Sequence, residues 1–180
     1  MLLNEDRRIK LTKKMLKDAL IDLLERKDIY HISIRELCEA ADVNRTTFYK
    51  YYGSQFELLA DMENDTLALI GEALTKYPDR RELVIEDACR YLDANLKLAR
   101  LLVNNNVDPE FPEKLFSMTA LKDAVKNGSG REFTLEFGEY LYGYMTYGAY
   151  QVIRTWLNKD EREKPEDIAR ILIGIIESNF

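Results

Sequence analysis

Three helix-starting signals lie close together between residues 33 and 54, and their spacing limits how this stretch can fold. Ser33 and Ser54 each precede a glutamate by three residues, which is the pattern of a capping box. Asn44, between them, is another favoured N-cap residue. These signals predict two short helices over residues 34–41 and 45–51, separated by a tight turn, and a longer helix that begins after Ser54.

The rest of the chain also has helical periodicity. Apolar residues recur at spacings of three and four, and the stretches between them contain Pro, Gly or Asn. No segment has the signal of a β-hairpin, so we predict an all-α fold. The predicted helices cover residues 9–26, 34–41, 45–51, 55–76, 80–103 (one or two helices), a helix beginning at Pro112, residues 132–157, and a helix beginning at Pro165.

The two short helices have helix-turn-helix spacing, in which the second helix enters the major groove of DNA. This second helix reads Arg45-Thr46-Thr47-Phe48-Tyr49-Lys50-Tyr51. Thr can contact a thymine methyl group, and Arg or Lys can contact a guanine edge. Phe48, with Val43 and Tyr52, is spaced to pack against the first short helix, and Gly53 favours a left-handed C-cap. The segment is therefore predicted to read base pairs.

The wider pattern resembles the TetR family of transcriptional repressors. The resemblance covers about residues 9–60, in order and without gaps. It runs through Leu16, Ala19, Leu20, Leu23 and Leu24, then residues 33–41, residues 42–49, residues 51–54, and Glu57-Leu58-Leu59.

The resemblance implies a set of DNA-binding residues. Residues 45–47 lie where the family reads bases, and Tyr49 matches a tyrosine that contacts the DNA backbone. Ser33 and Ser54 match helix-capping positions near phosphates. Gln55 departs from the family, which commonly has Lys there, so this position brings no charge. The full set is Ser33, Arg45, Thr46, Thr47, Tyr49, Lys50, Ser54 and Gln55.

The charge of the chain is unevenly distributed. The whole chain has 26 Lys and Arg against 32 Asp and Glu, a net charge of −6, which at first argues against a nucleic-acid binder. Residues 1–60 nevertheless carry a net charge of +1, and residues 61–180 carry −7. Residues 1–17 alone carry +4, and a basic arm before a helix-turn-helix is placed to reach phosphates.

The C-terminal part is expected to dimerise. Residues 133–156 contain eight aromatic residues, and a helix that is apolar on most sides must be buried on most sides. Gly138, Gly143 and Gly148 would let a neighbouring helix approach closely. A four-helix interface between two chains, which is also the family's usual dimer, predicts a C2 homodimer. The predicted interface residues are Phe137, Leu141, Gly148, Val152, Trp156, Ile168, Leu172 and Ile175.

The same part is expected to bind a small hydrophobic or aromatic effector that releases the DNA. An aromatic stripe at helical spacing is also common in an ordinary core. The candidate ligand-binding residues are Tyr91, Phe116, Met118, Tyr140, Tyr144 and Tyr147.

No enzymatic chemistry is predicted. The only histidine, His31, has no accompanying catalytic motif, and Cys38 and Cys89 have neither metal-ligand nor disulfide spacing. No cofactor or metal is expected. No apolar run approaches the roughly 20 residues that span a bilayer, so we expect no membrane contact and a cytoplasmic protein.

These observations predict a helix-turn-helix DNA-binding domain over residues 1–60 and a larger helical dimerisation and ligand-sensing domain over residues 61–180. The expected function is that of a homodimeric repressor, released from a palindromic double-stranded DNA operator by a small molecule. Two alternatives stay open. One is a constitutive DNA-binding regulator without an effector, and the other is a helical ligand- or protein-binding module that has lost DNA binding.

Overall fold

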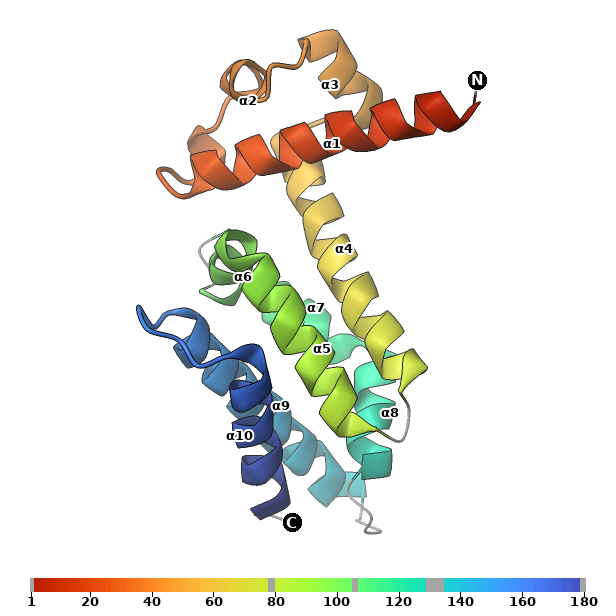
Figure 1. Ribbon diagram of the computed structural model, residues 1–180, viewed down its shortest axis with the longest axis vertical. Coiled ribbons are helices and arrows are strands. Elements are labelled where there is room, and N and C mark those ends of the chain that lie inside the picture. Colours follow the sequence, from red (N-terminus) through yellow and green to blue (C-terminus); the bar gives the residue numbers. More distant parts are fainter. Residues whose placement is uncertain (1, 78–79, 105–106, 129–134, 179–180) are drawn as a thin grey trace. The chain divides into compact units, whose positions relative to one another are not determined.

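The computed structural model describes residues 2–77, 80–104, 107–128 and 135–178. These residues form ten α-helices and one short 3₁₀ helix, with no strand among them, which confirms the predicted all-α fold (Figure 1). The elements are α1 Leu2–Leu24, η1 Ile29–His31, α2 Ile34–Ala40, α3 Arg45–Tyr51, α4 Gln55–Lys76, α5 Arg81–Ala94, α6 Leu96–Val103, α7 Phe111–Ser117, α8 Thr119–Gly128, α9 Leu135–Leu157 and α10 Pro165–Ser178.

The chain divides into two compact units, Met1–Thr66 and Leu67–Phe180. The first unit contains α1, α2, α3 and the start of α4, and the second contains the end of α4 and the remaining helices. The division therefore falls within one continuous helix rather than in a loop.

The predicted N-caps of α2 and α3 are confirmed. The Ser33 hydroxyl accepts a hydrogen bond from the Glu36 N–H at 3.2 Å, and the Asn44 side-chain oxygen accepts one from the Thr46 N–H at 2.8 Å. Each cap satisfies an amide that has no partner within its own helix. Because each helix is only seven residues long, these caps make up a large part of its local stabilisation.

The predicted left-handed Gly53 is wrong. The residue with a left-handed backbone is Asp42, at φ 51°, in the turn between α2 and α3. Gly53 instead provides space, because a Cβ there would lie 2.8 Å from a carboxylate oxygen of Glu57. That carboxylate accepts the Gly53 N–H at 2.7 Å, while the Ser54 hydroxyl accepts the Glu57 N–H at 3.3 Å. In an ordinary capping box the glutamate accepts the N–H of the N-cap residue, which is Ser54 here. The Glu57 carboxylate instead accepts the N–H of Gly53, one residue earlier.

The core of the first unit draws on all four of its α-helices, and α1 packs on α2, which packs on α3. Its side chains with no exposed surface are Leu16, Leu20, Leu37, Phe48 and Leu58. The amphipathic pattern of the sequence predicts this core, since each of these residues lies on the apolar face of its helix.

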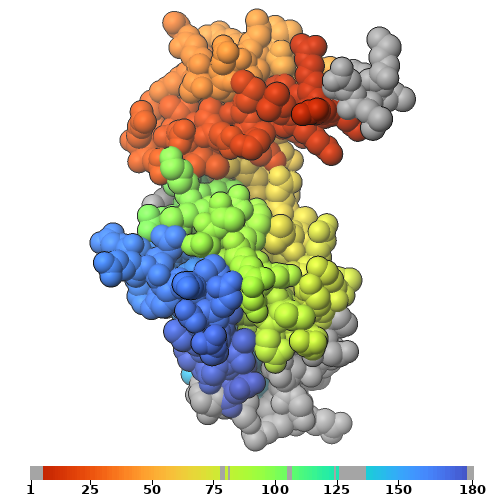
Figure 2. Space-filling view, viewed as in Figure 1, coloured from red at the N-terminus to blue at the C-terminus, as the bar shows by residue number. Residues whose placement is uncertain are grey.

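The second unit is built around Trp156. Its ring is 1% exposed, among buried residues from α5, α6, α9 and α10, and its indole N–H donates to the Glu163 carbonyl at 2.9 Å. Helices α5 and α10 pack side by side, as Figures 1 and 2 show in green and blue. The buried cluster contains Cys89, Ala99, Val103, Trp156, Leu157, Ile168, Ala169 and Leu172.

Several helix boundaries differ from the predicted ones. Helix α1 begins at Leu2 rather than near residue 9, and the helical stretch over residues 80–103 divides at Asn95 into α5 and α6. Helix α8 continues to Gly128. The predicted start, at residue 132, of the helix that corresponds to α9 lies in residues 129–134, outside the described residues.

Candidate nucleic-acid interface

Helix α3 presents a polar surface around one buried anchor. Phe48 is fully buried, whereas most of the predicted base-reading and backbone-contacting side chains of α3 are exposed. The Phe48 ring packs edge-on against Tyr49, with 5.5 Å between ring centroids. The exposed residues are Arg45, Thr46, Tyr49 and Lys50, and Thr47 is partly exposed. The structure therefore brings these predicted DNA-binding residues together on one seven-residue helix.

The remaining predicted contacts lie at helix starts. Ser33 is exposed and Ser54 partly exposed, and each hydroxyl accepts a bond from its own helix, which leaves its O–H free to donate to a phosphate. The Gln55 amide points elsewhere. Its nitrogen lies 3.5 Å from the carbonyl oxygen of Ile29, at the outer limit of a hydrogen bond.

The predicted basic arm has two parts. Lys17 binds Asp61 at 2.8 Å and Asp65 at 2.6 Å, and Lys13 lies 3.7 Å from Asp61, so these two lysines join α1 to α4. Lys14 pairs with an aspartate one turn along α1. The exposed basic residues nearer the N-terminus are Arg7, Arg8 and Lys10. The arm therefore offers fewer charges to phosphates than its sequence suggests.

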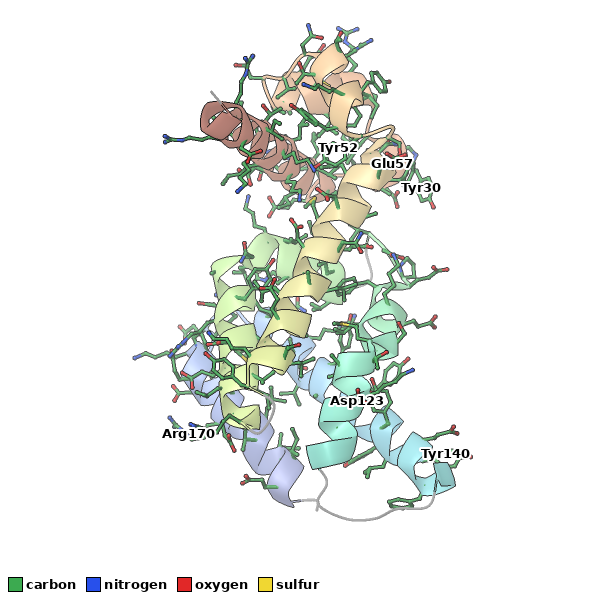
Figure 3. All side chains as sticks on the ribbon, turned by 90° about the vertical axis from the view of Figure 1, so that its right-hand side faces the viewer. Tyr30, Tyr52, Glu57, Asp123, Tyr140 and Arg170 are labelled. Carbon is green, nitrogen blue, oxygen red and sulfur yellow. The ribbon has the colours of Figure 1, made fainter. Side chains whose placement is uncertain are left out.

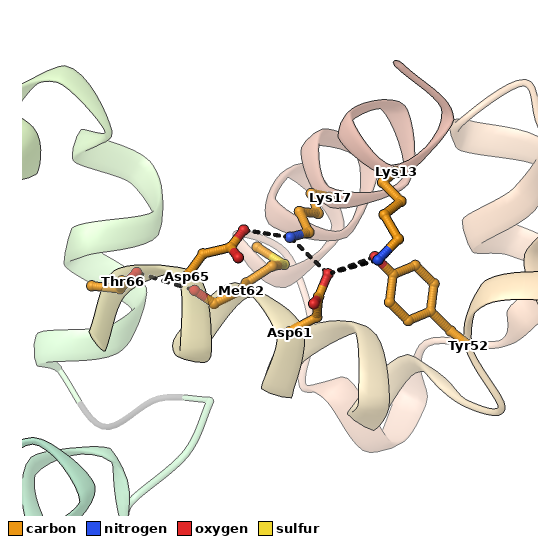
Figure 4. A network of polar contacts seen from close by, with 7 residues as sticks. All are labelled: Lys13, Lys17, Tyr52, Asp61, Met62, Asp65 and Thr66. Atoms are coloured by element: carbon orange, nitrogen blue, oxygen red, sulfur yellow. Dashed lines mark hydrogen bonds and ion pairs between the residues drawn. The ribbon is translucent and has the colours of Figure 1, made fainter. Parts of the chain in front are cut away.

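Sequence reasoning missed a polar cluster around Asp61 (Figure 4). The Tyr52 hydroxyl donates to the Asp61 carboxylate at 2.7 Å, and Lys17 donates to the same oxygen. The sequence contains a signal for this cluster in the spacing of its charges. Lys13 and Lys17 are four residues apart, as are Asp61 and Asp65, so each pair lies on one face of its helix. The signal indicates two charged faces but not that α1 and α4 bring them together.

The state of charge of this cluster follows from its contacts. Burial, together with the hydrogen bond to Asp61, raises the pKa of Tyr52, so its hydroxyl stays protonated and donates. Partial burial alone would raise the pKa of Asp61, but the hydrogen bonds from Lys17 and Tyr52 outweigh it and lower that pKa. Asp61 is therefore ionised at neutral pH.

The predicted ligand-binding residues fall into two environments. Tyr140, Tyr144 and Tyr147 on α9 are 75%, 64% and 54% exposed, and Figure 3 shows Tyr140 at the surface. Phe116 is buried, and its ring lies 4.6 Å from that of Tyr147. Tyr91 and Met118 are half-buried. The three tyrosines therefore form an exposed stripe rather than the lining of an enclosed cavity.

The predicted dimer residues also divide. Four of them pack within their own unit: Leu141, Trp156, Ile168 and Leu172 are all buried. The others reach the surface, with Phe137, Gly148 and Ile175 exposed and Val152 partly so. Trp156, Ile168 and Leu172 are buried because they pack in one cluster with residues of α5 and α6.

The described residues hold neither a group of metal-ligating side chains nor a helix suited to span a membrane. No three His, Cys, Asp or Glu side chains there are grouped so that they could hold a metal ion. None of the described helices combines the length and the apolar character needed to cross a membrane.

Two family models match the chain. The model described as bacterial regulatory proteins of the tetR family matches residues 16–62, which contain α2, α3 and the Asp61 cluster's carboxylate. The model described as a transcriptional regulator C-terminal region matches residues 79–178. Together they cover most of both units.

Two curated relatives are similar in sequence. The uncharacterized HTH-type transcriptional regulator YxbF of Bacillus subtilis is 24% identical over 163 residues, 86% of this chain and 42% of that protein. The dhaKLM operon transcriptional activator DhaS of Lactococcus lactis is 35% identical over 86 residues, 47% of this chain and 45% of that protein. The chain thus spans less than half the length of these relatives.

Solved structures share the fold. A TetR transcriptional regulator from Streptococcus agalactiae has a TM-score of 0.67 at 21% identity, covering 98% of this chain and 99% of that one. The activator DhaS has a TM-score of 0.66 at 18% identity, and the match covers 93% of this chain and 95% of that one. Thermus thermophilus FadR, a repressor in complex with lauroyl-CoA, has a TM-score of 0.53 at 17% identity. The match covers 92% of this chain and 93% of that one. On the matches of both family models, this chain belongs to the TetR family of helix-turn-helix transcriptional regulators.

Proposed function

We propose that this protein represses transcription in the cytoplasm by binding a palindromic DNA operator as a homodimer. The observation that carries the proposal is the surface of α3, where Arg45, Thr46 and Lys50 are exposed around the buried Phe48. A helix held in this way can enter the major groove, and its side chains match the chemistry of base edges. The positive net charge of residues 1–60 supports a polyanionic partner.

We place the contact between subunits on the exposed stripes of α9 and α10. Tyr140, Tyr144 and Tyr147 lie on α9, and Ile171 and Ile175 are half-exposed on α10. Large apolar side chains grouped on a surface commonly mark a protein interface. A Cβ at Gly143 or Gly148 would meet no atom within 4 Å, so a helix from a second chain has room to approach. Two-fold symmetry would present two α3 helices about 34–36 Å apart.

We propose regulation by a small hydrophobic or aromatic effector. The support is the aromatic group of α7 and α9, in which the Phe116 ring lies 4.6 Å from Tyr147 and 5.7 Å from Tyr150. Thermus thermophilus FadR, which shares the fold, is in complex with lauroyl-CoA, a ligand with an apolar acyl chain.

A second candidate function is activation rather than repression, because the relative DhaS is named an operon activator. Both functions need the same DNA-binding surface. They differ in the position of the operator relative to the promoter, so a reporter gene with the selected operator placed upstream or downstream of the promoter distinguishes them.

Selection of bound duplexes from a random DNA pool tests the proposed function directly. We expect enrichment of a two-fold symmetric sequence whose half-sites lie about one helical turn apart. Enrichment of no sequence would contradict DNA recognition, and enrichment of an isolated half-site would contradict the homodimer. A thermal-shift screen with apolar and aromatic compounds tests the effector. An absence of stabilisation by every class would favour constitutive binding.

A further inference from the structure

Helix α3 has one apolar anchor and needs a second fixed point. Phe48, near its centre, is the buried residue of the helix, and the other side chains are exposed or, at Thr47 and Tyr51, partly exposed. A seven-residue helix fixed at one point can pivot about that point, which would move Arg45 and Lys50 in opposite directions. Base recognition requires side chains held in position, because a bidentate contact tolerates little displacement.

The second fixed point is Tyr52, one helical turn after Phe48. Tyr52 is the C-cap of α3 and only 5% exposed, so its hydroxyl is directed into the unit. That hydroxyl donates to a carboxylate oxygen of Asp61 at 2.7 Å. The position is therefore fixed by a directional bond, whereas Phe48 is held by packing alone.

Asp61 joins this end of α3 to two other helices (Figure 4). It belongs to α4, and the same carboxylate oxygen binds Lys17 of α1 at 2.8 Å. Lys13, also on α1, lies 3.7 Å from that oxygen, and its ammonium group stands 5.2 Å from the centre of the Tyr52 ring. Asp65 holds Lys17 from the other side at 2.6 Å.

The bonds of this cluster are of a strong kind. The acceptor is ionised, and hydrogen bonds to a charged partner are shorter and stronger than those between neutral groups. All members lie within residues 13–65 of the first unit, and they connect α1, α3 and α4. Losing the Tyr52 hydroxyl would free the C-terminal end of α3 and leave the apolar core unchanged.

We propose that Tyr52 and Asp61 are positioning residues for DNA recognition, which hold α3 at the orientation in which its exposed side chains meet base edges. This inference rests on the proposed DNA-binding function. Neither residue reads a base, because Tyr52 is buried and Asp61 is bound to Tyr52 and Lys17. Their effect is on selectivity, the ratio of dissociation constants for an unrelated duplex and the operator.

The central experiment compares Tyr52→Phe with Tyr142→Phe in the full chain. Tyr142 makes a comparable bond, since its hydroxyl donates to the Phe116 carbonyl at 2.6 Å, but it lies in the second unit. We expect Tyr52→Phe to reduce selectivity about tenfold, the equivalent of one hydrogen bond to a charged group, with non-specific affinity unchanged. We expect Tyr142→Phe to lower the melting temperature without changing selectivity.

A second pair of variants tests the role of Asp61. Asp61→Asn keeps an oxygen that can accept the Tyr52 hydroxyl, so most of the selectivity should remain. Asp61→Ala removes the acceptor and should lose at least as much selectivity as Tyr52→Phe. Equal selectivity in the Asn and Ala variants would overturn the proposal.

Amide hydrogen exchange gives a readout that does not need DNA. Tyr52→Phe should speed exchange in α3 relative to α1, because only α3 loses an attachment. If the wild-type chain enriches no sequence from the random pool, the proposed function is wrong. If the Tyr52→Phe variant leaves amide exchange in α3 unchanged, Tyr52 is not a second fixed point of the helix, whatever the DNA result. If the wild type enriches an operator and Tyr52→Phe binds it with the same selectivity, only the positioning proposal is wrong.

Discussion

The exposed large apolar side chains come from several elements in the first unit, among them Leu11 and Tyr30, and lie along α9 and α10 in the second. In the first, apolar residues such as Phe48 are buried and the exposed face of α3 is polar. In the second, Tyr140 and Tyr144 are more than half exposed along α9, beside a fully formed core around Trp156. Since exposed apolar surface costs free energy in water, the difference fits the two partners of the proposed function, a polar polyanion for the first unit and an apolar surface for the second.

The polar contacts differ in the same way. The first unit caps its helices with neighbours in sequence, as at Ser33 and Asn44. The second unit joins distant segments through single bonds, such as Tyr150 to the Val103 carbonyl at 3.0 Å and Arg100 to the Leu157 carbonyl at 2.7 Å. The short helices of the first unit are thus specified by local sequence, whereas its Asp61 cluster and the packing of the second unit depend on long-range contacts.

Phe48→Ala should have the largest effect and be confined to the first unit. Removing a fully buried phenyl ring leaves a cavity and should cost about 3–5 kcal/mol of folding free energy. Trp156 is the only tryptophan and lies in the second unit, so its fluorescence follows that unit, while circular dichroism follows both. In urea unfolding, we expect the midpoint of the dichroism transition to fall further below its wild-type value than the midpoint of the fluorescence transition. Equal shifts would mean that the units unfold together.

Tyr144→Glu tests the apolar face of the second unit. Tyr144 is 64% exposed, so the subunit should fold normally. A carboxylate buried without a partner in an interface costs several kcal/mol, and we expect the dimer dissociation constant to rise about 100-fold or more. Sedimentation velocity measures this change. Tyr30→Glu, at a tyrosine of the first unit that is 78% exposed, is the matched control and should remain dimeric.

The double variant Thr47→Ala, Lys50→Ala tests the polar face of the first unit. Each lost base contact is worth about 1–3 kcal/mol, so selective operator binding should fall roughly 100-fold. The dimer should be unaffected, because both residues lie on α3. In contrast, Lys10→Ala removes an exposed charge and should weaken binding to all duplexes equally. Retained sequence preference in the double variant would show that α3 is not the reading helix.

The same contrast explains what the sequence predicts. The short helices follow from Ser33, Asn44 and Ser54, since a cap and the amide that it binds lie within three residues of each other. The sequence favours a left-handed backbone at Gly53, but that conformation lies at Asp42, in the turn between α2 and α3, and Gly53 provides space for the Glu57 carboxylate. Local patterns thus locate the helices well and the individual dihedral angles less well.

Long-range contacts limit prediction in the second unit. Two apolar stripes on α9 are visible in the sequence, but periodicity does not say which stripe faces its own subunit. The structure buries Trp156 among residues of α5, α6 and α10 and exposes Tyr140 and Tyr144. The Asp61 cluster has the same origin, since Lys17 and Asp61 are 44 positions apart in the sequence.

Gln55→Lys should have the smallest effect and sharpen the electrostatic side of the comparison. The Gln55 amide makes only a marginal contact, 3.5 Å from the Ile29 carbonyl, so its loss should cost little stability. A lysine at the start of α4 that reaches a phosphate should steepen the logarithmic salt dependence of operator binding by about 0.9 per subunit.

Gln55→Met isolates the charge in this experiment. Methionine is similar in length to lysine and has no charge, so the salt dependence of operator binding by Gln55→Met should equal that of the wild type. If Gln55→Lys also leaves the slope unchanged, the start of α4 does not meet the backbone, and the DNA contact lies on α3 and the exposed basic residues of α1. If the slope steepens, the first unit binds phosphate at this helix start as well, and its neutral glutamine keeps the affinity below what the fold allows.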